Sequence, residues 1–320
     1  MSASPAAPGG AGRPNLEVFA DTLLELARGD RDIVVVTGDS RGSGKLAPFA
    51  AQLPAQLVEV GIAEQNLVGI AAGLASAGKK VFAVSPACFL TARALEQVKN
   101  DVAYSNNPVK LVGISAGVSY GALGATHHSL HDLAALRAIP NIDVVVPADN
   151  FETRQAIRAA VGHPRPMYLR FGKAPMPHLH LPDARFTVGR SIAVRFGDAA
   201  AFIATGEAVH PAVEAAGLLE VEGIRCRVIS MHTIKPLDRA AILDAGATGA
   251  VVTAEEHSVH GGLGEACAAV LLEAGARCRF RLVGLPDEPT VHGSQREIFE
   301  HYGLSGAAMA QTMRRLLGGA

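Results

Sequence analysis

The sequence has no tryptophan and few cysteines, and no two cysteines form a C-x-x-C pair. Cys88, Cys226, Cys267 and Cys278 are scattered over a chain of 320 residues. Structural zinc sites and disulfide frameworks need clustered or regularly spaced cysteines, so this pattern argues against both. We therefore expect a protein of the reducing cytoplasm whose own residues hold no metal.

The sequence also has no excess of charge of one sign. It contains 29 Lys and Arg residues and 30 Asp and Glu residues. Nucleic-acid binding surfaces need clustered positive charge, so no nucleic-acid partner is expected. The longest stretch without formal charge, 111–131, is long enough to span a membrane. Glycines, serines and histidines interrupt it, which fits a loop over a ligand better than a membrane helix.

The chain instead alternates helical and strand patterns, as α/β proteins do. Residues 15–28 carry leucines and a phenylalanine at helical spacing, and 33–36 is a short β-branched run typical of a buried parallel strand. A second series begins with an apolar strand pattern at 200–204 and another at 226–230. The sequence therefore predicts two doubly wound α/β domains, the first with a mostly parallel sheet.

Composition suggests where these domains begin and end. Residues 1–14 consist mainly of Ala, Gly, Pro and Ser and lack the basic start and apolar block of a signal peptide, so we expect a disordered tail. Residues 174–186 contain several prolines and histidines and are predicted to be a linker. The first domain is then 15–173 and the second 187–320.

One carboxylate stands out at the junction between a β-branched run and a helical pattern of small residues. Glu64 is followed by about a dozen residues with almost no charge. It could simply favour a helix N-terminus through the macrodipole. Alternatively, it is a tuned acid, base or hydrogen-bond partner, because burying a carboxylate without such a role costs several kcal/mol. Residue type alone leaves both interpretations open.

Three other patterns predict chemistry less well. The loop 38–45 is similar to a P-loop, but Leu46 stands where Ser or Thr must hold magnesium. The segment 261–265 is similar to a dinucleotide fingerprint, but Cys267 replaces the third glycine. The histidines of 127–132 have helical spacing that could suit a metal, or they are polar loop residues satisfied by backbone; no third metal ligand is evident.

The segment Val60-Gly61-Ile62-Ala63-Glu64-Gln65-Asn66 resembles the Gly-Ile-x-Glu motif of transketolases and related thiamine-diphosphate enzymes. In that family the glutamate hydrogen-bonds the cofactor's aminopyrimidine and helps to activate it. The later segment from Phe89 to Gln97 resembles the family run whose first phenylalanine stacks on the same ring. The resemblance thus implies that Glu64 and Phe89 bind thiamine diphosphate.

Further family landmarks follow in order to near the C-terminus and suggest substrate-binding residues. Thr126-His127 matches a motif whose histidine contacts the reacting substrate oxygen, and an imidazole suits proton transfer near neutral pH. The loop after the first strand resembles one that would place Asp39 near the cofactor and Ser43 at a substrate phosphate. Arg170 matches an arginine that binds a substrate phosphate or carboxylate, although a structural ion pair is an equally simple role.

The chain departs from transketolases at two places. Ala122-Leu123 replace an acidic pair that contacts a sugar hydroxyl, and Ser115 stands where a phosphate-binding histidine is expected. The cofactor chemistry can survive these changes. Ketose recognition and phosphate binding are the functions that they affect.

The diphosphate-binding motif of the family, Gly-Asp-Gly followed by Asn, does not occur in the sequence. That motif belongs to an N-terminal domain for which 320 residues leave no room. The resemblance therefore implies one half of a split enzyme, in which a partner subunit binds the diphosphate and Mg²⁺, as an α2β2 heterotetramer.

The function implied is transfer of a two-carbon ketol unit from a ketose to an aldehyde. Two alternatives stay open: the β subunit of a 2-oxoacid dehydrogenase or another acyloin-forming enzyme, which Ala122-Leu123 would suit, and a non-catalytic regulatory partner. The sequence does not identify the donor or the acceptor.

Overall fold

The computed structural model describes residues 10–181 and 183–318, so most of the predicted tail lies outside the described residues. Its last part is bound to the segment predicted as a linker. The backbone N–H of Met176 donates to the carbonyl of Arg13 (3.2 Å), and that of His178 donates to the carbonyl of Gly10 (3.1 Å). The described end of the tail is therefore hydrogen-bonded to the rest of the chain.

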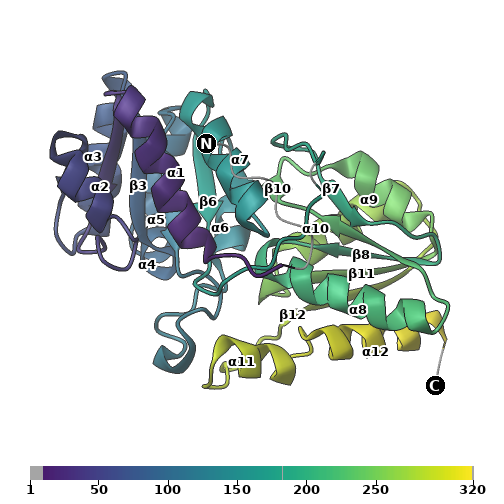
Figure 1. The fold of residues 1–320 in the computed structure, drawn as a ribbon. Helices are drawn as coiled ribbons and strands as arrows, with labels where there is room; N and C mark the ends of the chain where they lie inside the picture. The colour runs from purple at the N-terminus through teal and green to yellow at the C-terminus, as the bar shows by residue number, and fades with distance from the viewer. Residues whose placement is uncertain (1–9, 182, 319–320) are drawn as a thin grey trace.

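The first α/β unit is built on a seven-stranded sheet, shown at the left of Figure 1. In spatial order its strands are β10 (Thr233–Lys235), β5 (Asp143–Val145), β6 (Met167–Arg170), β4 (Lys110–Ile114), β3 (Lys80–Pro86), β1 (Ile33–Thr37) and β2 (Leu57–Glu59). All neighbours are parallel except β10 and β5. The buried strands are continuous apolar runs because helices cover both faces.

Helices on the two faces of this sheet form two separate cores. One face packs against α1 (Asn15–Gly29) and α7 (Asn150–Gly162). The other face packs against five further helices. Of these, α3 packs on the sheet with a face that contains several alanines. The five helices are α3 (Glu64–Ser76), α4 (Ala87–Ala92), α5 (Leu95–Gln97), the π-helix Val98–Tyr104 and α6 (Asp132–Ala138), while the short α2 (Ala47–Gln52) follows β1.

The second α/β unit contains a five-stranded sheet in which only β7 is antiparallel to its neighbour. Its order is β12 (Arg279–Leu285), β11 (Ala250–Ser258), β8 (Ala200–Ala204), β9 (Cys226–Ser230) and β7 (Ile192–Arg195). One face is covered by α9 (Arg239–Gly246) and α10 (Leu263–Glu273), and the other by α8 (Val209–Val221), α11 (Gln295–His301) and α12 (Gly306–Leu317). Two α/β units with mostly parallel sheets confirm the predicted fold class.

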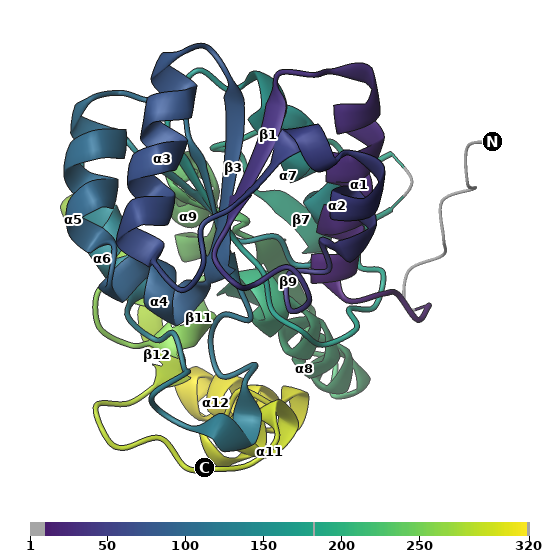
Figure 2. The same cartoon turned by 90° about the vertical axis from the view of Figure 1, so that its left-hand side faces the viewer.

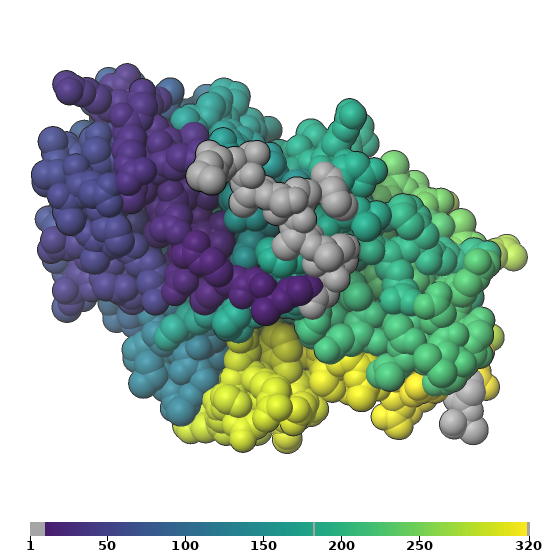
Figure 3. Space-filling model, in the orientation of Figure 1, coloured from purple at the N-terminus to yellow at the C-terminus, as the bar shows by residue number. Residues whose placement is uncertain are grey.

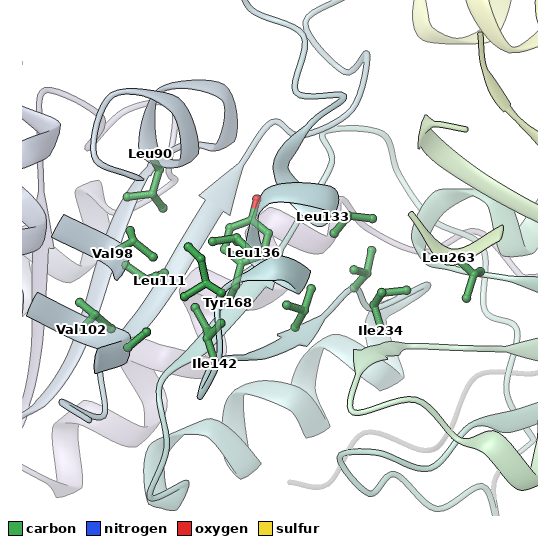
Figure 4. Close-up of a cluster of buried hydrophobic side chains, with 14 of the residues drawn as sticks. Leu90, Val98, Val102, Leu111, Leu133, Leu136, Ile142, Tyr168, Ile234 and Leu263 are labelled. Carbon is green, nitrogen blue, oxygen red and sulfur yellow. The ribbon is translucent and has the colours of Figure 1, made fainter. Parts of the chain in front are cut away.

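The two units share a strand and a core. Strand β10 comes from the second half of the chain but pairs antiparallel with β5 at the edge of the first sheet, so that Thr233 lies opposite Val145. Ile234 of β10 and Leu263 of α10 belong to the same buried cluster as Leu133 and Tyr168 (Figure 4). The sequence did not predict this exchange, and it joins the two units into one packed body.

No helix within residues 10–181 and 183–318 is both long enough and apolar enough to cross a bilayer.

Candidate functional site

The candidate residues meet at the carboxyl ends of the strands of the first sheet. Neighbouring parallel strands bring the loops that follow them to one edge, which is where α/β proteins build their sites. Five candidate residues come from this edge. They are Asp39 after β1, Glu64 after β2, Phe89 after β3, His127 after β4 and Arg170 at the end of β6. The sheet order thus explains why residues far apart in sequence lie near each other.

Glu64 is the first residue of α3 and is 5% exposed. Its two carboxylate oxygens lie 3.2 and 3.3 Å from Nη1 of Arg93, which donates to both. The helix N-terminus favours its negative charge, so the macrodipole interpretation also fits its position. Because the carboxylate is buried and accepts from a cationic partner, it is a buried hydrogen-bond acceptor rather than a solvated helix end.

Phe89 and His127 adjoin this ion pair. The guanidinium carbon of Arg93 lies 4.0 Å from the centre of the Phe89 ring. The rings of Phe89 and His127 meet edge to face with centroids 5.4 Å apart. Such edge-to-face contacts fix ring orientation. Glu64, Phe89 and His127, predicted from three separate motifs, therefore belong to one contiguous group.

Two further residues of this group were not predicted. Tyr120 contacts His127 edge to face with ring centroids 5.2 Å apart, and Nζ of Lys173 lies 4.9 Å from the centre of the Tyr120 ring. The hydroxyl of Thr126 lies 2.9 Å from Nδ1 of His127 and helps to orient the imidazole. Lys173 follows Arg170 by three residues, so its position after a strand was the available signal.

The second α/β unit holds the loop that carries His127. This loop extends beyond the first sheet to lie beside α11 (Figures 1 and 2), and Figure 3 shows the blue and yellow segments in contact. Glu256 accepts a hydrogen bond from the backbone N–H of Val118 (2.9 Å). Gly117, at φ +61°, lies so close that a Cβ there would be 2.2 Å from Cδ of Glu256. The start of the loop thus has little room to move.

The Glu256 carboxylate belongs to a buried acidic pair. The side-chain amide of Gln295 donates to Oε1 of Glu256 (2.8 Å) and also to Oε2 of Glu207. Burial raises the pKa of Glu256 to about 7, although Arg170 opposes the rise. Burial and the charge of Glu256 raise the pKa of Glu207 to about 8. Near neutral pH the pair therefore retains a proton.

Arg170 makes a buried ion pair, which is one of the two roles that the sequence left open. It is buried, its Nε donates to Oδ2 of Asp132 (2.8 Å), and its Nη2 donates to the carbonyls of Ser129 (3.1 Å) and Glu256 (2.8 Å). Burial disfavours its charge, but Asp132 and Glu256 outweigh burial and raise the pKa of Arg170. These contacts favour the ion-pair interpretation over a substrate ligand.

Asp39 and Ser43 lie on the loop after β1. The backbone N–H of Asp39 donates to Oε1 of Glu59 (2.7 Å), and Asp39 lines a hollow of about 280 Å³ with Gly61 and Ile62, just before Glu64. The hydroxyl of Ser43 donates to the carbonyl of Ser40 (3.3 Å) and is thus bonded within its own loop. Asp39 therefore adjoins the Glu64 turn, whereas the observed bond of Ser43 is local.

The two departures from the family motifs also have defined places. Ser115 is buried and has a positive φ of 53°, so it shapes the start of the His127 loop. Leu123 is 57% exposed at the tip of that loop.

The histidines of this loop were also considered as metal ligands. Within the described ranges no three His, Cys, Asp or Glu side chains are grouped to hold a metal. The Nε2 of His128 instead donates to the carbonyl of Gly121 (3.0 Å).

Comparison with known proteins gives two family matches in the same order as the two α/β units. Residues 14–177 match the pyrimidine-binding domain of transketolase, and residues 189–309 match the transketolase C-terminal domain. The chain is 51% identical over 296 residues to one subunit of an apulose-4-phosphate transketolase from Phocaeicola vulgatus, covering 92% of this chain and 94% of that protein.

Two further relatives differ in length. A 1-deoxy-D-xylulose-5-phosphate synthase of Heliobacterium modesticaldum is 39% identical over 303 residues, which are 94% of this chain but 46% of that protein. A solved split gene transketolase, described as an inactive beta4 tetramer, matches with a TM-score of 0.85 at 37% identity and covers 96% of this chain and 98% of that one. The chain therefore belongs to the transketolase family, as its pyrimidine-binding domain followed by its C-terminal domain.

Proposed function

We propose that this chain is one half of a split thiamine-diphosphate-dependent transketolase, which transfers a two-carbon ketol unit from a ketose donor to an aldehyde acceptor. The observation that carries the proposal is the group formed by Glu64, Phe89 and His127. The planar guanidinium of Arg93 contacts both residues of the cofactor side. It donates to the buried Glu64 carboxylate and lies over the Phe89 ring. An aminopyrimidine is also flat and donates hydrogen bonds, so the residues fit that cofactor.

Each residue of the group has a distinct role in this proposal. Thiamine diphosphate supplies the carbanion stabilisation when it is bound. Glu64 would hydrogen-bond a ring nitrogen of the aminopyrimidine and stabilise its protonated form, and Phe89 would offer its ring face. His127, oriented by Thr126 and Tyr120, exchanges a proton with the substrate oxygen. Asp39 lies next to the Glu64 turn and completes the cofactor side.

We propose that a separate N-terminal subunit supplies the diphosphate and Mg²⁺ site, in an α2β2 assembly. The sequence has no Gly-Asp-Gly motif of its own. Ile62, two residues before Glu64, is 74% exposed, and an exposed apolar side chain beside a site suits burial by a partner. The 51% identical relative is named as one subunit of a transketolase, which supports the same arrangement.

We assign substrate recognition to Lys173 rather than to Arg170, and Ser43 stays a phosphate contact proposed from the family resemblance, since its observed bond is to Ser40. Lys173 presents an ammonium beside Tyr120, and Arg170 is engaged by Asp132. The relative from P. vulgatus is named for a sugar phosphate. We therefore include sugar phosphates among the donors to be tested, with Lys173 as the group that meets the phosphate.

The decisive experiment combines this chain with its N-terminal partner, thiamine diphosphate and Mg²⁺, and measures ketol transfer. Activity should appear only in the complete mixture, and Glu64→Ala should remove nearly all of it. Turnover by this chain without a partner would overturn the split arrangement. Full activity of the Glu64→Ala complex would leave only a regulatory, non-catalytic role.

The main competing function is that of a 2-oxoacid dehydrogenase β subunit or an acyloin-forming enzyme. Exposed Leu123 at the tip of the His127 loop supports it, because this residue offers no partner to a sugar hydroxyl. The 39% identical relative is named as a deoxyxylulose-phosphate synthase. Donor profiling separates the two: release of CO₂ from a 2-oxoacid would replace ketose cleavage.

We also propose a cytoplasmic location. All four cysteines are free thiols, and three of them are buried. Burial raises the pKa of Cys88 and of Cys226 to about 11, so these thiols stay protonated and unreactive. Fractionation of cells, followed by thiol labelling of the unfolded protein, tests the location and the redox state together.

A further inference from the structure

Arg93 occupies the space between Glu64 and Phe89. Its Nη1 donates to both Glu64 oxygens, at 3.2 and 3.3 Å, while its guanidinium carbon lies 4.0 Å from the centre of the Phe89 ring. Phe89 and Arg93 are four residues apart around α4, a spacing that stacks side chains on one helix face. Glu64 approaches from the start of α3.

These two contacts are the ones that the proposed cofactor role requires of the aminopyrimidine. A flat ring that bonds to Glu64 and stacks on Phe89 at the same time must lie where the guanidinium lies. A guanidinium and an aminopyrimidine are both planar groups that carry N–H donors, but they cannot occupy one site at the same time. The aminopyrimidine therefore competes with Arg93.

We infer that Arg93 is a placeholder that the cofactor displaces, so that this arginine sets the affinity for thiamine diphosphate. The inference rests on the proposed function. The Glu64 side chain is 6% exposed, and an unpaired carboxylate in that position is costly, so the guanidinium stabilises it before the cofactor arrives. The Arg93 side chain is 49% exposed and has solvent into which it can move.

The first test measures cofactor affinity in the complex of this chain with its N-terminal partner. Calorimetric titration with thiamine diphosphate at saturating Mg²⁺ compares the natural chain with Arg93→Ala. Half-exposed ion pairs and cation–π contacts are weak, so their removal should tighten binding by about threefold to tenfold. Arg93→Lys keeps the charge but not the plane, and its affinity should lie between the two.

The second test needs no partner and no diphosphate. The probe is 4-amino-5-hydroxymethyl-2-methylpyrimidine, which corresponds to the cofactor's ring alone, and binding to the isolated full chain is followed by NMR. Arg93→Ala should bind this probe more tightly than the natural chain. Arg154→Ala, which changes an exposed arginine on α7, is the matched control and should bind it unchanged.

The outcomes separate this inference from the proposed function. If the natural complex binds no thiamine diphosphate, the proposed function fails. If the natural complex binds it and Arg93→Ala binds it equally or more weakly, the placeholder role is wrong and the weaker result makes Arg93 a cofactor ligand. Thermal unfolding of each variant shows whether it is folded, and Arg93→Gln replaces Arg93→Ala if the latter is not.

Discussion

Two arginine–carboxylate pairs lie at the same end of the first sheet but differ in nearly every physical respect. Arg93 is half-exposed and contacts Glu64 through one nitrogen and Phe89 through its plane. Arg170 is buried, donates through two nitrogens to three oxygen acceptors, and pairs with an Asp132 that is 0% exposed. The first pair can open to solvent, whereas the second cannot do so without unfolding.

The difference teaches that residue type does not distinguish a replaceable partner from a structural one. Asp132 also accepts from the hydroxyl of Tyr168 (2.7 Å), so its carboxylate is surrounded by donors. Burial disfavours its charge, but Arg170 and His257 outweigh burial and lower the pKa of Asp132. Glu64 has Arg93 as its side-chain partner, which leaves it available to another donor.

The largest effect is expected from Glu64→Gln, which tests the functional member of the comparison. Loss of this carboxylate should lower ketol transfer by roughly 10²–10⁴-fold, the range for acid–base groups. The free energy of unfolding should change by less than about 1 kcal/mol, because a half-exposed ion pair contributes little. Steady-state kinetics and urea unfolding measure the two quantities, and a large stability loss with normal turnover would reverse our assignment.

Arg170→Ala should show the opposite pattern. Removing one member of a buried pair leaves Asp132 charged and unpaired, which costs about 3–5 kcal/mol. Urea unfolding at neutral pH measures this loss. Arg158→Ala, which removes an exposed ion pair with Glu25, is the control and should cost less than about 1 kcal/mol. Equal losses for the two variants would contradict the distinction between buried and exposed pairs.

A third buried cluster extends the comparison to pH. His180 lies between Asp149 (2.9 Å) and Glu152 (3.0 Å). Burial opposes its charge, but the two carboxylates outweigh burial and raise the pKa of His180 to about 10. They should therefore stabilise the fold fully below the ordinary histidine pKa of about 6.5, and less as pH rises through 10.

The measurement for this cluster is urea unfolding of the natural chain and His180→Gln from pH 6 to pH 10. The natural chain should lose several kcal/mol of its advantage over the variant across this range. The same cluster lowers the pKa of Asp149 and of Glu152 against the effect of burial, so acid should also weaken it. A constant difference between the two proteins would show that His180 is neutral.

The smallest expected effect concerns the loop that both arginine pairs adjoin. Gly117→Ala places a methyl group against Glu256 and should shift His127, and a shift of about 1 Å can cost about 10²-fold in turnover. Gly73→Ala on α3 is the control, because a Cβ there meets nothing within 4 Å. Unchanged kcat in Gly117→Ala would mean that the second unit does not position the histidine.

Sequence patterns predicted the elements that stand on local runs. The expected strands 200–204 and 226–230 coincide with β8 and β9, and the expected helix 15–28 lies within α1, because continuous apolar runs and helical spacing are local signals. Strand β10 was missed because three residues, Thr-Ile-Lys, carry no period. Its partner β5 is distant in sequence, so only tertiary structure shows the pairing.

The same limit applies to the site. The motifs identified Glu64, Phe89 and His127, and the structure brings these residues together. The motifs did not reveal that Arg93, which lies in the same segment as Phe89, fills the space between Glu64 and Phe89. That contact depends on how α3 and α4 pack. Nor could the motifs show the contacts of Arg170, whose three acceptors come from two segments, 129–132 and Glu256.

The exchange of β10 has a consequence for synthesis on the ribosome. Until Lys235 has emerged, β5 has no neighbour on its outer side, and its backbone groups are open to pairing with another chain. A nascent chain that stops between the two units would therefore expose β5 as an unpaired edge strand of an incomplete sheet. Fragments that end before Thr233 should be prone to aggregation. Splitting the chain into two polypeptides at that point should therefore lower the yield of folded protein.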